Sequence, residues 1–170
     1  SSLGGGGGIY IGDSFLSLVN NTITGNTVQS SSGDGFGGGI RCESASALAV
    51  FNTILYDNSA DHGSEISLGD IDISFLYVGQ SDVKNGQQGV HVEPGNILIW
   101  GSGNIDADPI FIDPLDDDFH LTYQSPCRDS GDNSAVTALL DFEGDPRVSS
   151  SKVDMGADEF HAHLYWTGEA

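Results

Sequence analysis

Gly-Gly-Gly-Ile-Tyr-Ile at residues 6–11 returns as Gly-Gly-Gly-Ile-Arg-Cys at residues 37–42. Each copy is followed by a polar step and an apolar run that leads into Asn, Thr and Ile. These are Asn21-Thr22-Ile23 in the first copy and Asn52-Thr53-Ile54 in the second, and both alignments have the same offset of 31 positions. Self-similarity at such a period indicates a stacked architecture, in which each repeat buries its apolar face against the next.

Each repeat contains short apolar runs separated by Gly, Asn and Ser, and no run has the period of a helix. Three short strands joined by turns would make one rung of a coil, and successive rungs would pair in parallel about 4.8 Å apart. Gly suits bends where a side chain would collide with the next rung, and Asn suits turns with left-handed backbone. The sequence therefore predicts an all-β fold, a right-handed parallel β-helix (solenoid) whose rungs fill residues 1–103.

These rungs resemble those of right-handed parallel β-helix proteins of the pectin-lyase-like type, whose Gly-Gly-Gly-Ile-Tyr and Asn-x-Thr-Ile-x-x-Asn segments look like the ones here. The same pattern of short apolar runs predicts a third rung downstream, with strands at Glu65–Leu68, Ile71–Tyr77 and Gln80–Val83. A further compact strand is predicted at Ile97–Trp100.

A second resemblance covers residues 104–160. Five motifs, in order and spacing, resemble the C-terminal segment of bacterial surface β-helix proteins known as the choice-of-anchor Q domain. They lie at residues 104–114, 118–121, 125–132, 141–147 and 153–160. The resemblance implies an exported bacterial protein displayed at or beyond the cell surface, and it implies no catalytic activity. We expect this segment to form closing rungs and an irregular C-terminal cap of the same domain.

Length and charge exclude several classes of partner. The 170 residues suffice for one domain with its own core. The chain carries 25 acidic against 5 basic residues, a formal net charge of −20 at pH 7. It lacks the basic surface that nucleic acid or an anionic membrane would require, and no apolar run is long enough to span a bilayer. We therefore expect no nucleic-acid partner and no membrane insertion. The expected extracellular or cell-surface location is what the resemblance implies.

The two cysteines, Cys42 and Cys127, are far apart in the chain. They either form one disulfide or lie as small buried apolar groups, and the sequence leaves both alternatives open.

The beginning of the coil has no visible cap before Gly4, although natural β-helices cover the unpaired strand edges of an end rung. The tail, residues 161–170, contains an apolar patch at Leu164-Tyr165-Trp166 that would not remain free in water. We expect this patch to dock on its own coil or on a neighbour's bare first rung, around Gly4, Ile9 and Ile11. Head-to-tail contacts of that kind generate filaments when they do not close into a ring.

The main functional prediction is therefore a non-catalytic structural or adhesive protein that assembles with itself and needs no cofactor. Polyuronate lyases of this fold use Arg or Lys at the site, and Arg41 and Lys84 are the only basic residues in the coil. A glycosidase needs two carboxylates at a set separation across the sugar, which adjacent residues such as Asp116–Asp118 do not fix.

The alternative is a module that binds or degrades polysaccharide, with calcium as a ligand. Calcium takes six to eight hard oxygen ligands, but no Asp-x-Asp-x-Asp-Gly loop specifies a site. A metal site at His161 and His163, which would share a strand face, is a further alternative. The calcium candidates are Asp106, Asp108, Asp113, Asp116, Asp117 and Asp118.

Arg147 lies in a strongly acidic part of the chain. We predict that it is partly buried and forms an ion pair with Asp154 and Glu159, which would pin the tail to the last rung.

Overall fold

The computed structural model describes residues 6–70 and 72–161. Its main body consists of three parallel sheets whose strands alternate along the chain. The first sheet contains β1 (Ile9–Gly12), β4 (Ile40–Glu43), β7 (Ile66–Leu68) and β10 (Val90–Val92). The second contains β2 (Phe15–Val19), β5 (Ala47–Phe51), β8 (Phe75–Gly79) and β11 (Ile97–Trp100), and the third contains β3 (Thr22–Thr24), β6 (Ile54–Tyr56) and β9 (Asp82–Val83).

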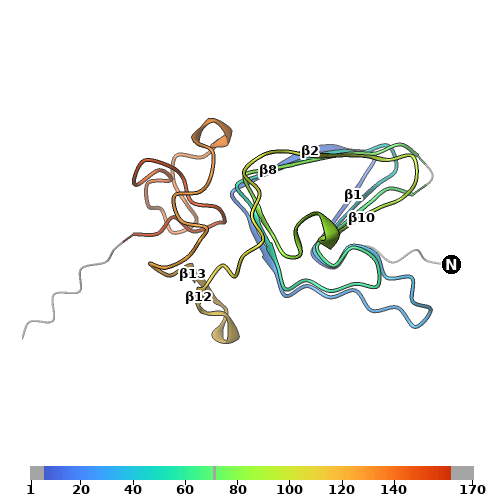
Figure 1. Cartoon of the computed structure of the whole chain (residues 1–170), viewed down its shortest axis with the longest axis horizontal. Helices are drawn as coiled ribbons and strands as arrows, with labels where there is room; N and C mark the ends of the chain where they lie inside the picture. Colours follow the sequence, from blue (N-terminus) through green and yellow to red (C-terminus); the bar gives the residue numbers. More distant parts are fainter. Residues whose placement is uncertain (1–5, 71, 162–170) are drawn as a thin grey trace, which may run out of the picture.

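Consecutive strands thus belong to different sheets, and each strand pairs with its counterpart one rung away. Figure 1 looks along the coil, so that the strands of successive rungs overlap as the sides of one winding. The predicted all-β parallel solenoid is confirmed. The other elements are the antiparallel pair β12 (Phe111–Asp113) and β13 (Asp118–Leu121) and the short 3₁₀ turns η1 (Gly86–Gly89), η2 (Pro114–Asp116) and η3 (Asn133–Ala135).

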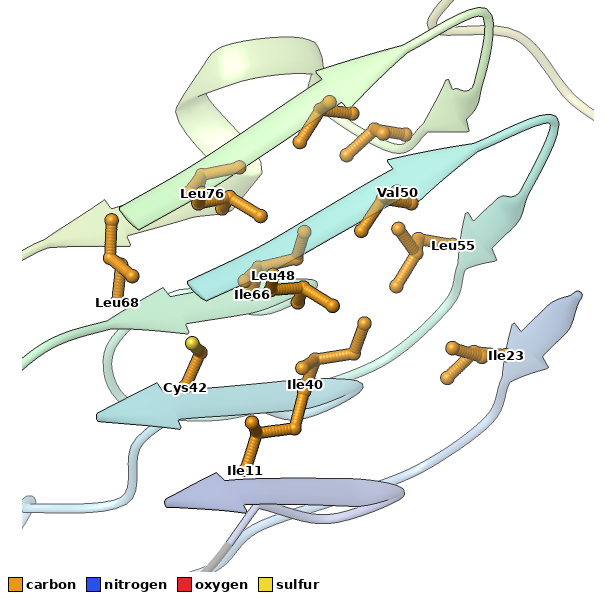
Figure 2. Packing of buried hydrophobic residues seen from close by; sticks show 13 residues of the cluster. Ile11, Ile23, Ile40, Cys42, Leu48, Val50, Leu55, Ile66, Leu68 and Leu76 are labelled. Atoms are coloured by element: carbon orange, nitrogen blue, oxygen red, sulfur yellow. The ribbon is translucent and has the colours of Figure 1, made fainter. Parts of the chain in front are cut away.

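The core of the coil is a set of in-register columns of apolar side chains that point inward (Figure 2). Ile40 of β4 lies between Ile9 and Ile66, and Leu48 of β5 is paired with Leu76 of β8. Alternate residues of a strand face opposite sides, so the repeat brings like residues together on every rung. Burial of these columns is the main force holding the rungs together.

Polar ladders run through two corners of the coil. At the first corner, Ser14 N–H donates to Ser46 Oγ, Ser46 N–H to Ser74 Oγ, and Ser74 N–H to Asn96 Oδ1, over 2.7–3.2 Å. An equivalent ladder at the second corner ends at Asn104. Each side chain satisfies a backbone donor that the turn leaves without a strand partner, which explains the many Ser, Thr and Asn residues in the repeats.

The register corrects one detail of the sequence alignment. Ile9 pairs with Ile40 as predicted, but Ile23 pairs with Leu55 rather than with Ile54. The second rung has an extra corner residue, because both Ser44 and Ala45 adopt positive φ where the first rung has only Asp13. A slip of one residue exchanges the faces of a strand. Leu55 therefore packs in the coil, and Ile54 belongs to a second cluster outside it.

Most of the C-terminal segment, residues 104–161, lies beside the coil (yellow through orange to red in Figure 1). It packs on the outer side of the β3–β6–β9 sheet, where Leu121, Cys127 and Met155 surround Ile54. The expected irregular segment is present. Its first residues still stack on the last rung, where Ile105 forms a parallel bridge with Asp82 of β9, and the rest of the segment packs against the side of the coil. Among the described residues, no helix has the length and apolar character needed to cross a membrane.

Candidate functional site

The first component of the site is a histidine on the outlying hairpin. Asp118 and His120 lie two residues apart on β13, so their side chains share one face of the strand. Oδ1 of Asp118 accepts hydrogen bonds from the backbone N–H of His120 at 3.2 Å and from its Nδ1 at 2.5 Å. This arrangement fixes the orientation of the imidazole and directs Nε2 away from Asp118.

The second component is Glu143, in the loop after the η3 turn. Asp141 organises that loop, because its Oδ1 accepts the backbone N–H groups of Glu143, Gly144 and Asp145 at 2.9–3.0 Å. The loop places Oε2 of Glu143 at 3.1 Å from Nε2 of His120.

The third component, Asp158, follows a stretch of backbone that is held on two sides. The guanidinium of Arg147 donates to the carbonyl oxygens of Gly156 and Ala157, and the N–H of Ala157 donates to Thr22 Oγ1 of the coil at 3.0 Å. Asp158 itself is buried, and its Oδ2 accepts the N–H of Leu121 at 2.8 Å. Its position therefore depends on both the coil and the hairpin.

These three side chains converge although they lie far apart in the sequence. One ligand atom each from His120, Glu143 and Asp158 can be chosen such that all lie within 4.8 Å of one another. His120 and Asp158 line two neighbouring hollows of about 510 and 280 Å³. The larger hollow opens between β3 of the coil and the C-terminal segment, with Phe119 and Phe142 among its apolar walls.

The electrostatics of the site follow from burial and hydrogen bonding. The hydrogen bond with His120 lowers the pKa of Asp118, and the same bond, aided by the one to Glu143, raises the pKa of His120 despite partial burial. Burial raises the pKa of Asp158. Burial alone would also raise the pKa of Asp141, but its backbone N–H donors hold it below the ordinary value.

The predicted calcium ligands are not brought together. Asp106 accepts the N–H of Asn85, Asp108 accepts that of Ile110, and Asp117 is a left-handed residue after η2. Asp113 directly precedes that same turn, and Asp116 is its last residue. Of the six calcium candidates, only Asp118 contacts the cluster of His120, Glu143 and Asp158, and it does so as the hydrogen-bond partner of His120. Sequence reasoning missed His120, Glu143 and Asp158, because their separations match no ligand spacing; the paired Asp118 and His120 were the one local signal.

The other predicted residues are placed as follows. Arg147 is 2% exposed, but its guanidinium contacts are with carbonyl oxygens, so the predicted direct ion pair with Asp154 and Glu159 is wrong in its partners. Those carboxylates act on Arg147 only through space. The positive charge of the buried guanidinium is balanced by the nearby carboxylates, and backbone carbonyl oxygens accept its hydrogen bonds.

The sequence left open whether Cys42 and Cys127 form a disulfide or lie as small buried groups. In the structure, both are buried free thiols. Among the predicted assembly residues, Ile11 is buried in the coil and Ile9 packs against the same core. Gly4 and Leu164, Tyr165 and Trp166 lie outside the described residues, as does His163.

A second surface is set apart by its lack of charge. The outward residues of the second sheet form columns in register, with Phe15, Ala47, Phe75 and Ile97 in one of them. The neighbouring column contains Ser17, Ala49, Tyr77 and Ile99. A shallow groove of about 480 Å³ runs over this face, which we call the apolar sheet face.

No protein-family model matches this chain, and comparisons with curated proteins and with solved structures find no match either.

Proposed function

We propose that this protein is a non-catalytic structural or adhesive β-solenoid that associates with a second copy of itself through the apolar sheet face. The observation that carries this proposal is the composition of the two outward columns on β2, β5, β8 and β11. In a chain with a formal charge of −20, they contain no charged residue over four successive strands. Phe15 is 87% exposed and Ile99 is 53% exposed. A contiguous apolar patch of this kind marks an interaction surface.

The chemistry of the apolar sheet face favours protein over polysaccharide. A sugar ring stacks on aromatic side chains but also needs hydrogen-bonding partners for its hydroxyl groups. In the two columns, only Ser17 and Tyr77 provide polar side chains. Unpaired hydroxyl groups would cost free energy on burial. A second apolar face has no such cost, and the two-fold pairing of identical faces is the common form of homodimers.

The resemblance of residues 104–160 to the choice-of-anchor Q domain, and of the rungs to pectin-lyase-like surface proteins, supports an exported bacterial protein at the cell surface. The acidic surface is consistent with that location. Head-to-tail association remains a further prediction of the same class, since β1, β2 and β3 are the outermost strands of their sheets in the described residues. Backbone pairing at such edges would extend the coil.

The proposal is tested by the mass of the protein in solution. Sedimentation velocity from about 1 to 100 μM should show a concentration-dependent shift from monomer toward dimer or larger species. Phe15→Glu combined with Ile99→Glu should shift this equilibrium at least tenfold toward monomer, because charges would be buried in the interface.

The control is a double variant with the same change in charge away from the sheet. Leu139 is 90% exposed and Leu115 is 95% exposed, and both lie in the C-terminal segment. Leu115→Glu with Leu139→Glu should leave the association unchanged. A wild-type protein that stays monomeric at every concentration, or that is affected equally by both double variants, would contradict the proposal. Glycan binding lost with Phe75→Ala would instead support the polysaccharide alternative.

A further inference from the structure

We propose that His120, Glu143 and Asp158 form a binding site for a divalent transition-metal ion of the zinc class. The ligand atoms would be Nε2 of His120 and one carboxylate oxygen from each acid. They come from β13, from the Asp141–Asp145 loop and from the stretch after Gly156, and they lie within 4.8 Å of one another. Ligands of a tetrahedral zinc ion lie somewhat closer than this, at metal distances of about 2.0–2.2 Å. Rotation of the partly exposed Glu143 side chain would complete the approach.

The hydrogen bonds of His120 match those of a metal ligand. In zinc sites, the histidine nitrogen that does not bind the metal donates to a carboxylate, which fixes the ring and increases the basicity of the other nitrogen. Nδ1 of His120 has such a partner in Oδ1 of Asp118, at 2.5 Å. Asp118 is itself held by the backbone N–H of His120. The imidazole is thus oriented with Nε2 toward Glu143 and Asp158.

An independent observation points to a ligand in the same place. His161 lines the 280 Å³ hollow together with His120, Glu143 and Asp158. Its Nε2 is buried and makes no hydrogen bond within the described part of the chain. A buried nitrogen without a partner costs free energy, so it calls for an ion or a water molecule in the hollow. A metal-bound water molecule in the hollow would provide that partner.

The types of ligand atom in the cluster determine which metal ion it suits. Calcium prefers six to eight oxygen ligands, whereas this site has an imidazole nitrogen and two carboxylates. Imidazole together with carboxylate suits zinc and its first-row neighbours. The site would therefore bind Zn²⁺ rather than the calcium that the acidic sequence suggests. Since its ligands come from three separate segments, binding would also fasten the loop and the C-terminal stretch to the hairpin.

The experiment uses the full chain, dialysed against a chelator and titrated with ZnCl₂ by calorimetry. We expect one equivalent to bind with a Kd in the micromolar range or below. At a hundredfold excess over Kd, the melting temperature should rise by about 5–10 °C. CaCl₂ at the same concentration should produce no such rise. Co²⁺ should bind at the same site and give visible absorption bands of a nitrogen- and oxygen-ligated ion.

Variants identify the ligands. His120→Gln and Asp158→Asn should each weaken Zn²⁺ binding at least tenfold and abolish the Co²⁺ bands, while Asp118→Asn should weaken it about 10–100-fold by releasing the ring. The matched control is His91→Gln. His91 also lies 3.1 Å from a glutamate, Glu93, but among the described residues the pair belongs to no group of three ligands, so its loss should leave Zn²⁺ binding unchanged. Circular dichroism checks that each variant is folded.

Two results would overturn the inference. One is a wild-type protein that binds Zn²⁺ only in the millimolar range. The other is binding that His91→Gln reduces as much as His120→Gln does, because it would reflect scattered surface carboxylates and histidines. Should Asp158→Asn fail to fold, Glu143→Gln replaces it, because the Glu143 side chain is 42% exposed and contributes little to packing.

Discussion

Asn52 and Asp132, which are 80 positions apart in the chain, exchange two hydrogen bonds. Nδ2 of Asn52 donates to the carbonyl oxygen of Asp132 at 3.0 Å, and the N–H of Asp132 donates to Oδ1 of Asn52 at 2.7 Å. Asn52 sits at a corner of the coil with a φ of 47° and is fully buried. A residue that shapes the turn of a rung therefore also fastens the C-terminal segment to the coil.

Replacing Asn52 with Gly should destabilise the protein by about 2–3 kcal/mol. Gly tolerates the left-handed backbone, so the change in unfolding free energy reports mainly the loss of the two hydrogen bonds. It includes the cost of leaving the buried backbone groups of Asp132 without partners. Asn20 occupies the equivalent corner one rung earlier, and within the described residues its side chain makes one hydrogen bond, to the carbonyl oxygen of Asp154. Asn20→Gly should therefore cost only about 1 kcal/mol. Urea unfolding measures both, and equal losses would show that the pairing with Asp132 contributes nothing.

Glu65 should make the stability of the fold decrease with rising pH. Its side chain is fully buried, and burial raises its pKa from 4.5 to about 7 although Asn58 donates a hydrogen bond to Oε2. The folded chain therefore binds this proton more tightly than the unfolded chain does. The contribution of the protonated group is complete below pH 4.5 and is lost as pH rises to 7, a change of about 3 kcal/mol.

Glu65→Gln tests this sign, because glutamine is neutral and nearly the same size. Asp82 and Asp154 also have pKa values raised by burial, to about 6, so the pH dependence of the wild type alone would not isolate Glu65. The difference in unfolding free energy between variant and wild type should grow by about 3 kcal/mol in favour of the variant between pH 4.5 and 8. A difference that is constant with pH would mean that Glu65 titrates normally.

Arg147 should be essential for the C-terminal segment through its hydrogen bonds. Arg147→Met keeps much of the side-chain volume but leaves the carbonyl oxygens of Gly156 and Ala157 without these donors. We expect a loss of about 2–4 kcal/mol and a melting temperature lower by roughly 5–15 °C. Arg147→Lys should lose less, because it can still donate to one carbonyl oxygen. Calorimetry with an unchanged melting temperature in Arg147→Met would refute this role.

The thiols of Cys42 and Cys127 should be unreactive in the folded protein. Both side chains are fully buried, and burial raises the pKa of Cys42 to about 11 and that of Cys127 above its ordinary value. A thiol reagent should therefore detect no thiol in the native state and two after unfolding in denaturant without a reductant. Detection of no thiol after unfolding would mean that the two residues are joined.

The repeat made much of the coil predictable. Ile9 and Ile40 were aligned from the sequence and are paired in the structure, and the strand predicted at Ile97–Trp100 has those bounds. Neighbouring rungs present like residues to one another, so similarity in sequence implies contact in space. The alignment of Ile23 failed by one position, because the extra corner residue at Ser44 and Ala45 changes the offset from 31 to 32 before that strand begins.

The candidate metal site could not be predicted in the same way. His120, Glu143 and Asp158 come from three segments without periodicity, and no spacing rule connects them. The acidic residues that the sequence did favour, such as Asp106 and Asp108, mostly accept hydrogen bonds from nearby backbone. Acidic composition alone does not distinguish these roles.

By itself, the sequence determined the coil: its repeat, the apolar residues that point inward and the glycines and asparagines at its corners. Those features act between adjacent rungs, so a local pattern is enough to specify them. Only the tertiary structure decided where residues 104–161 lie and which side chains meet there. That segment is held by bonds between side chains and distant backbone, such as those of Asn52 and Arg147, and a linear pattern does not encode such partners.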